Sequence, residues 1–117
     1  MKTVRFLVVT PDKILRDEIL TVLTPPFHWV QFAENVQYVQ EHPELLDEMN
    51  YVIIDELGGW LAADFIARYP KTNFIYLDGL ARHFSMNTPN FRTISKLNLL
   101  ATLNNFRYGL FEKHVTV

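Results

Sequence analysis

The 117-residue chain contains no cysteine and only four glycines. The absence of cysteine excludes disulfides, thiolate metal sites and cysteine nucleophiles, and it is consistent with a reducing compartment. No glycine-rich phosphate loop is present, because the pair Gly58-Gly59 stands alone after a strand-like segment, which argues against a dinucleotide or flavin site. No Gly-x-Ser-x-Gly sequence occurs either, so nothing supports a hydrolase triad.

The chain also lacks a charge excess and long apolar runs. Its formal net charge is -2 and its Lys and Arg residues are scattered, so we expect no nucleic-acid partner. No apolar run approaches the ~20 residues of a membrane span, and the N-terminal residues do not resemble a signal peptide. We therefore expect a cytoplasmic protein without a membrane partner. The four histidines lie far apart and predict no metal site.

What the sequence does contain is a regular alternation of strand-like and helix-like segments. With 49% hydrophobic and 21% charged residues, residues 1–117 are expected to form a single globular domain. Runs rich in β-branched and aromatic residues predict five strands, at residues 4–10, 28–32, 51–55, 73–78 and 91–95. Helical spacing of apolar residues predicts helices at about 13–23, 35–49, 60–69 and 97–112.

This order predicts an α/β fold, a three-layer sandwich with a five-stranded parallel sheet and helices on both faces. The first, third and fourth strands are the most continuously apolar and should be central. In the first helix Ile14, Leu15 and Ile19 are expected to face the core, whereas Pro43 should divide the second helix. Residues 79–90 are less clear and could hold a short helix at about 80–84.

Polar residues follow the strand ends and should gather on one rim of the sheet. Asp55 ends the most buried run, and at the rim it is expected to be reachable by water. A carboxylate near a lysine at such a rim can handle phosphate or a metal. The rim is predicted to hold Thr10, Pro11, Asp12, Asp55, Asp78 and Lys96.

Five βα units in this length, an acid ending the third strand and a lysine ending the fifth resemble the receiver domain of two-component response regulators. The resemblance covers essentially the whole chain. It implies a flavodoxin-like, CheY-like fold with strand order 2-1-3-4-5. It also implies that Asp55 stands at the phospho-acceptor position, Lys96 at the position of the phosphoryl-pairing lysine, and Arg16 at that of an arginine in the first helix.

The chain departs from the pattern of that family at several positions. The two acids that hold Mg²⁺ in the family fall on Thr10 and Pro11, with Asp12 one position late. The phosphate-sensing Ser or Thr falls on Asp78, and the aromatic switch residue falls on Thr93. A leucine, Leu97, follows the lysine, where the family usually has proline.

These departures predict an atypical, phosphorylation-independent receiver, or pseudo-receiver. Asp55 alone, or with Asp12, would hold Mg²⁺ weakly, so we expect no cofactor. The expected role is a non-enzymatic signalling module that works by protein contact. The alternatives are a receiver phosphorylated on Asp55 with unusual Mg²⁺ ligation, and a small-ligand sensor.

Each rim residue also has a structural interpretation. Asp55 could be a polar strand end, Asp12 an N-cap, and Lys96 a salt-bridge partner of Asp55 or Asp78. Asp78 could instead cap a helix, or share a proton or metal with Asp55.

Aromatic residues near the C-terminus suggest a surface for a protein partner or a homodimer. By resemblance, the last helix and the fifth strand are the usual partner face of a receiver. The candidate contact residues are Phe84, Phe91, Tyr108 and Phe111. A patch of exposed apolar residues would mark such a face, unless residues 80–90 cover it.

Overall fold

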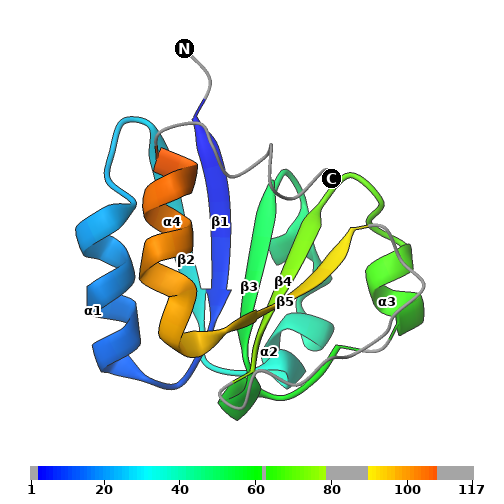
Figure 1. Cartoon of the computed structure of the whole chain (residues 1–117). Helices are drawn as coiled ribbons and strands as arrows, with labels where there is room; N and C mark the ends of the chain where they lie inside the picture. The colour runs from blue at the N-terminus through cyan, green and yellow to red at the C-terminus, as the bar shows by residue number, and fades with distance from the viewer. Residues whose placement is uncertain (1–2, 62, 79–89, 108–117) are drawn as a thin grey trace.

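The computed structural model describes residues 3–61, 63–78 and 90–107, and these residues form an α/β fold (Figure 1). Its strands are β1 (Val4–Val9), β2 (His28–Ala33), β3 (Tyr51–Asp55), β4 (Asn73–Asp78) and β5 (Phe91–Ser95). Its α-helices are α1 (Lys13–Val22), α2 (Val36–Glu41), α3 (Ala63–Ala67) and α4 (Leu99–Arg107). Short 3-10 turns are η1 (Pro43–Leu46), η2 (Glu56–Gly58) and η3 (Lys96–Asn98).

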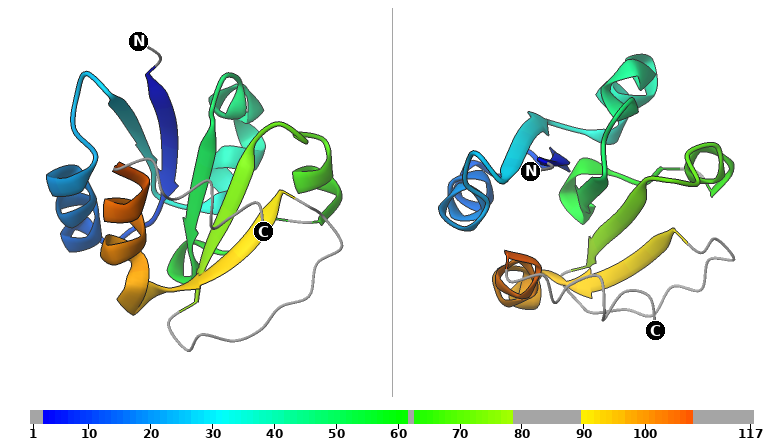
Figure 2. Two further views of the ribbon diagram at one scale, coloured as in Figure 1. Left: turned by 45° about the horizontal axis from the view of Figure 1, so that its top comes forward. Right: turned by 90° about the horizontal axis from the view of Figure 1, so that it is seen from above.

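The five strands form one parallel sheet in the order β2-β1-β3-β4-β5. Helices α1 and α4 cover one face of this sheet, and α2 and α3 cover the other (Figures 1 and 2). The predicted three-layer architecture and the strand order are both confirmed. The most apolar strands are central because they are covered on both faces, whereas β2 and β5 lie at the edges.

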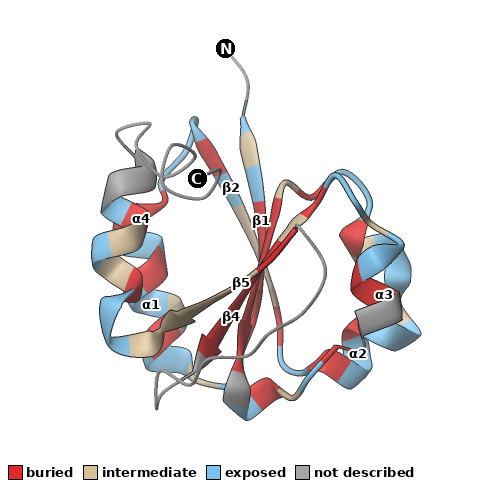
Figure 3. Cartoon of the chain, turned by 45° about the vertical axis from the view of Figure 1, so that its right-hand side comes forward, coloured by how far each residue is buried: buried red, intermediate tan, exposed pale blue. Residues whose placement is uncertain are grey.

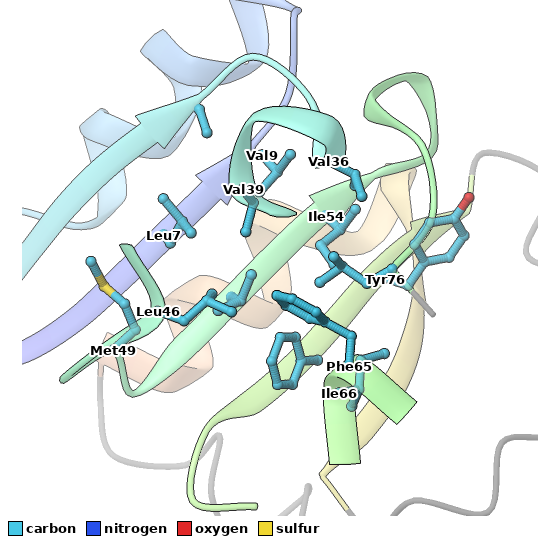
Figure 4. Close-up of a cluster of buried hydrophobic side chains, with 14 of the residues drawn as sticks. Leu7, Val9, Val36, Val39, Leu46, Met49, Ile54, Phe65, Ile66 and Tyr76 are labelled. Atoms are coloured by element: carbon cyan, nitrogen blue, oxygen red, sulfur yellow. The ribbon is translucent and has the colours of Figure 1, made fainter. Parts of the chain in front are cut away.

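The core is divided into two clusters by the sheet, because successive side chains of a strand point to opposite faces. In β3, Tyr51 and Ile53 pack under α1 and α4, whereas Val52 and Ile54 pack under α2 and α3. The cluster under α2 and α3 is drawn in Figure 4. The burial of the strands is shown in Figure 3. This two-sided burial explains why the strand is apolar at every position before Asp55.

Helix α1 begins at Asp12, whose side-chain Oδ1 accepts hydrogen bonds from the backbone N–H groups of Ile14 and Leu15. This is the N-cap arrangement that favours aspartate at the start of a helix. The helix buries Leu15 and Ile19, as predicted, but Ile14 is 70% exposed. The prediction for Ile14 was wrong because each residue turns the helix by about 100°, which carries Ile14 away from the face that Leu15 buries.

The second helical segment is divided at Pro43, as predicted, into α2 and the 3-10 turn η1. Helix α3 spans Ala63–Ala67, shorter than the predicted helix at 60–69. The last helical segment begins with the 3-10 turn η3, and α4 itself begins at Leu99 rather than at residue 97. The possible helix at 80–84 lies outside the described residues. Within the described ranges, no helix combines the length and apolar character needed to span a bilayer.

Candidate rim site at the ends of β1, β3 and β5

The pairing of β1 with β3 brings Thr10 and Asp55 together. In the register of the two strands Val8 lies opposite Ile53 and Val9 opposite Ile54. One step further along the ladder, Thr10 lies beside Asp55, and both point to the face covered by α1 because side chains alternate. The Thr10 hydroxyl donates a 2.7 Å hydrogen bond to Oδ2 of Asp55.

The Asp55 side chain is fully enclosed, with 0% of its surface exposed. Its Oδ2 also accepts a hydrogen bond from the Lys96 ammonium at 3.0 Å, and its Oδ1 accepts one from the backbone N–H of Leu57 at 3.3 Å. The expectation that Asp55 is reachable by water was therefore wrong. The strand ends at the rim, but the neighbouring residues close over its carboxylate.

Lys96 connects the two acidic residues of the site. Its ammonium lies 3.0 Å from Oδ2 of Asp55 and 3.8 Å from Oδ2 of Asp12, and its side chain is 25% exposed. A buried carboxylate needs such a partner, because an unpaired charge in the interior is strongly destabilising. The salt bridge to Asp55 is the structural role predicted for Lys96, here with Asp12 as a second carboxylate.

Thr10 is the residue on which the loop after β1 is arranged. Its hydroxyl oxygen accepts the backbone N–H of Asp12 at 3.1 Å while its proton is donated to Asp55. Its carbonyl oxygen accepts two hydrogen bonds from the Arg16 guanidinium, from Nε at 3.2 Å and from Nη2 at 2.8 Å. The same guanidinium lies over the ring of Phe32, 5.4 Å from its centroid, so Arg16 ties α1 to the loop and to β2.

Solved structures of similar shape include several response-regulator receivers. A response regulator receiver domain protein from Bacillus halodurans superposes with a TM-score of 0.71 at 13% identity, covering 93% of this chain and 97% of that chain. A response regulator from Thermotoga maritima gives 0.64 at 17% identity, covering 95% and 99%. The response regulator domain of Thermotoga maritima CheB gives 0.64 at 18% identity, covering 99% and 98%. The chain has the receiver fold.

A scan of the sequence against protein-family models finds no match, and a search of curated proteins finds none either. The receiver fold is therefore supported by the arrangement of the elements, which agrees over nearly the whole chain.

The receiver fold implies a Mg²⁺ ion at this rim, and the donors present do not fit one. Mg²⁺ needs oxygen ligands free to surround it in near-octahedral geometry. Both oxygens of Asp55 already accept protein hydrogen bonds, and one oxygen of Asp12 caps α1 while the other faces Lys96. Pro11 offers no side-chain ligand. In the part of the chain that the structure describes, no three His, Cys, Asp or Glu residues are grouped to hold a metal.

The structure also places the remaining predicted rim and switch positions of the receiver. Pro11 is exposed in the loop before α1. Asp78 lies opposite Ser95 at the end of the β4–β5 ladder, but its side chain lies outside the described residues. Thr93 is half-buried in β5, opposite Tyr76. Leu97, which follows Lys96, is 90% exposed.

One residue of the predicted partner face, Phe91, is buried in the structure. Phe91 is only 9% exposed and belongs to the core cluster under α2 and α3, 6.1 Å from the Trp60 ring by centroids. It is a core residue, so its prediction as a contact residue was wrong: the first residue of β5 points toward the sheet face that α3 covers. The other candidates, Phe84, Tyr108 and Phe111, lie outside the described residues.

The sequence analysis places Thr10 at the rim and at the position of a family acid, but it assigns no partner to the Thr10 hydroxyl. A signal was available in the strand pattern, since Thr10 follows Val8 by two residues and Asp55 follows Ile53 by two. That spacing places both polar side chains on one face, provided that the two strands are neighbours in register. The register itself is a tertiary property that the sequence did not provide.

Proposed function

We propose that this chain is an atypical receiver that takes part in signal transduction by protein contact, without phosphorylation of Asp55 and without enzymatic activity. The observation that carries the proposal is the enclosed Asp55 carboxylate, which is 0% exposed and has hydrogen-bond donors on both oxygens.

Phosphoryl transfer to a carboxylate requires a free oxygen in line with the donor and positive charge to compensate the incoming group. At this rim the Asp55 Oδ2 is held by Thr10 and Lys96, and Oδ1 is held by the backbone N–H of Leu57, so attack by either oxygen would require its contacts to break. The donors for a divalent cation, which would supply the compensating charge, are already engaged with the protein. The resting arrangement therefore opposes the reaction at both the nucleophile and the cation.

Incubation with Mg²⁺ and a small phosphodonor, and separately with beryllofluoride, tests the proposal. Intact mass and amide NMR shifts are expected to show no adduct, while a phosphorylatable receiver treated in parallel becomes modified. Asp55→Asn serves as the matched variant. An adduct that forms on the wild-type chain and is lost in Asp55→Asn would overturn the proposal.

The alternative function, a phosphotransfer receiver that uses Asp55 with unusual Mg²⁺ ligation, has one observation in its favour. The Lys96 ammonium lies 3.0 Å from the Asp55 carboxylate, where it could pair with a phosphoryl group transferred to Asp55. A positive result in the same experiment would establish this alternative.

A further inference from the structure

The outer edge of β2 lacks the features that usually keep an edge strand unpaired. In the described part of the chain β2 has β1 as its single neighbour, so its other side is an edge of the sheet (Figure 2). Sheet edges are commonly protected by charged side chains, by proline or by a bulge. The strand sequence, His-Trp-Val-Gln-Phe-Ala, contains no Lys, Arg, Asp, Glu or Pro, and its ladder with β1 runs without interruption. The edge is therefore open to pairing with another strand.

Two residues of β2 direct their backbone hydrogen-bonding groups away from β1. The carbonyl oxygen of Ala33 accepts the N–H of Thr10 at 2.9 Å, which places the odd-numbered residues of β2 against β1. Successive residues of a strand direct these groups to opposite sides. The N–H and C=O groups of Val30 and Phe32 therefore lie at the outer edge.

The two outward residues allow the strand to pair with a second copy of itself. With a twofold axis beside Gln31, Val30 of each copy lies opposite Phe32 of the other in an antiparallel pair. Each of these two pairs exchanges two backbone hydrogen bonds, so all the outward groups of both residues are used. An axis beside Val30 would instead place Phe32 opposite His28, whose N–H already donates to the Thr24 carbonyl oxygen. The register about Gln31 therefore satisfies the edge best.

The side chains that meet in this register are complementary. On the sheet face covered by α2 and α3, Trp29, which is 43% exposed, lies opposite the small Ala33 of the other copy. On the same face Gln31 meets its own copy, and an amide can both donate to and accept from another amide. On the opposite face the half-buried Val30 and Phe32 meet, an aliphatic–aromatic pair of the kind that stabilises sheets. None of these pairs brings like charges together.

Exposed apolar side chains beside the edge would extend the contact. The Arg16 guanidinium lies over the Phe32 ring, so the side of α1 that carries Arg16 faces β2. Leu20 is 46% exposed and lies one turn further along that side, because residues four apart share a helix face. Phe27, directly before β2, is 49% exposed. A second copy at this edge would remove part of this apolar surface from water.

We propose that this chain forms a homodimer in which two β2 strands pair antiparallel about Gln31 and join two five-stranded sheets into one. The occupant of the edge is a second copy because the hydrogen-bonding groups and the side chains of the strand complement themselves under twofold symmetry. This surface lies at the opposite edge of the sheet from β5, where the resemblance to receivers places a partner face. The proposal goes beyond the proposed function and does not depend on the chemistry of Asp55.

Hydrogen exchange on the wild-type chain tests the pairing without any substitution. Protection of the Val30 and Phe32 amides is expected to rise at least about tenfold as the protein concentration is raised through the dimerisation range. Protection of the Trp29 and Gln31 amides, which face β1, is expected to stay unchanged. Light scattering over the same concentration series is expected to show molecules of 13.7 kDa converting to molecules of twice that mass.

Opposite charges at position 31 test the register. Gln31→Lys and Gln31→Glu each place like charges directly opposite at the twofold axis, and each is expected to weaken dimerisation at least about tenfold. An equimolar mixture of the two variants is expected to restore the dimer, because Lys of one copy then faces Glu of the other. The matched control is Asn104→Lys, at an exposed position on α4, which is expected to dimerise as the wild type does. Thermal melts check that each variant is folded.

A single-chain mass at every concentration, or exchange of the Val30 and Phe32 amides that does not depend on concentration, would overturn the dimer. Dimerisation that Asn104→Lys abolishes and Gln31→Lys retains contradicts the β2 interface and places the contact on the last helix. Folded Gln31 variants that stay monomeric when mixed exclude the register about Gln31, and if either variant does not fold, the exchange measurement on the wild type decides. A phosphoryl adduct on Asp55 would count against the proposed function alone, so the two failures are distinguishable.

Discussion

The hydroxyl and the carbonyl oxygen of Thr10 make four hydrogen bonds to three residues at the rim, at a position where the receiver pattern has an acid. Its hydroxyl donates to the buried Asp55 carboxylate and accepts from the Asp12 N–H, while its carbonyl oxygen receives Arg16. A second carboxylate at position 10 would repel Asp55 unless a cation lay between them. A hydroxyl instead donates a hydrogen bond to the carboxylate, so we expect the rim to be stable without an ion.

Thr10→Val tests that contribution, because valine has the same shape without the hydroxyl. The free energy of unfolding is expected to fall by about 1.5–3 kcal/mol, as for the loss of a hydrogen bond to a charged group. Urea denaturation measures the change. Thr21→Val is the matched control, since Thr21 is exposed on α1 and its loss should change stability by no more than about 0.5 kcal/mol. Equal effects of the two substitutions would show that the Thr10 hydroxyl does not stabilise Asp55.

At the scale of elements, Asp12 has two separable roles. Its Oδ1 caps α1 by accepting two backbone N–H groups, and its Oδ2 lies 3.8 Å from the Lys96 ammonium. The cap satisfies backbone donors that a helix start would otherwise leave without partners. The ion pair is longer and partly exposed, and pairs of that kind contribute less than about 1 kcal/mol.

Two substitutions of Asp12 separate these roles. Asp12→Ala removes both and is expected to cost about 1 kcal/mol or slightly more in the free energy of unfolding. Asp12→Asn retains a capping oxygen and loses only the charge, so it should cost a few tenths of a kcal/mol. Hydrogen exchange of the Ile14 and Leu15 amides should rise in Asp12→Ala alone. A similar rise in Asp12→Asn would mean that the ion pair, not the cap, fixes the start of α1.

The elements could be predicted from the sequence because their signals are local. Alternation and β-branched content indicated all five strands, Pro43 divided the second helix, and continuous apolar runs indicated which strands are central. The outward direction of Ile14 was missed because a helix of ten residues contains more apolar residues than its buried face can hold. The enclosure of Asp55 was missed because its partners Thr10 and Lys96 lie 45 and 41 residues away.

At the scale of the whole molecule, the parallel sheet places the C-terminal ends of β1, β3 and β5 at one rim. A receiver with an ion-dependent rim would use this rim to bind a cation and a phosphoryl group. Here the polar side chains at this rim bind one another, and the contacts of Lys96 with Asp55 and Asp12 join the turn before α4 to the start of α1. The same topology therefore places an internal hydrogen-bond network at the end of the sheet where ligands of open α/β sheets usually bind.

A divalent cation is therefore expected to leave the stability of the wild-type molecule unchanged. Any ligand that binds only the folded state stabilises it by RT ln(1 + [L]/Kd), about 1.4 kcal/mol at ten times Kd, and that would raise the melting temperature by several degrees. Thermal melts in Mg²⁺ should match melts in NaCl of equal ionic strength, because the carboxylate oxygens of Asp55 and Asp12 are already engaged.

Thr10→Asp provides the complementary measurement. Without a cation this variant should melt below the wild type, because a second carboxylate faces Asp55 in the interior. Mg²⁺ or Mn²⁺ should recover part of that loss, since carboxylates at positions 10, 12 and 55 together supply the oxygen ligands that hard cations prefer. Thr10→Val, which adds no ligand, should show no recovery. If Mg²⁺ instead raised the melting temperature of the wild type beyond the NaCl control, the Thr10 hydroxyl and Lys96 would not be what keeps cations from this rim.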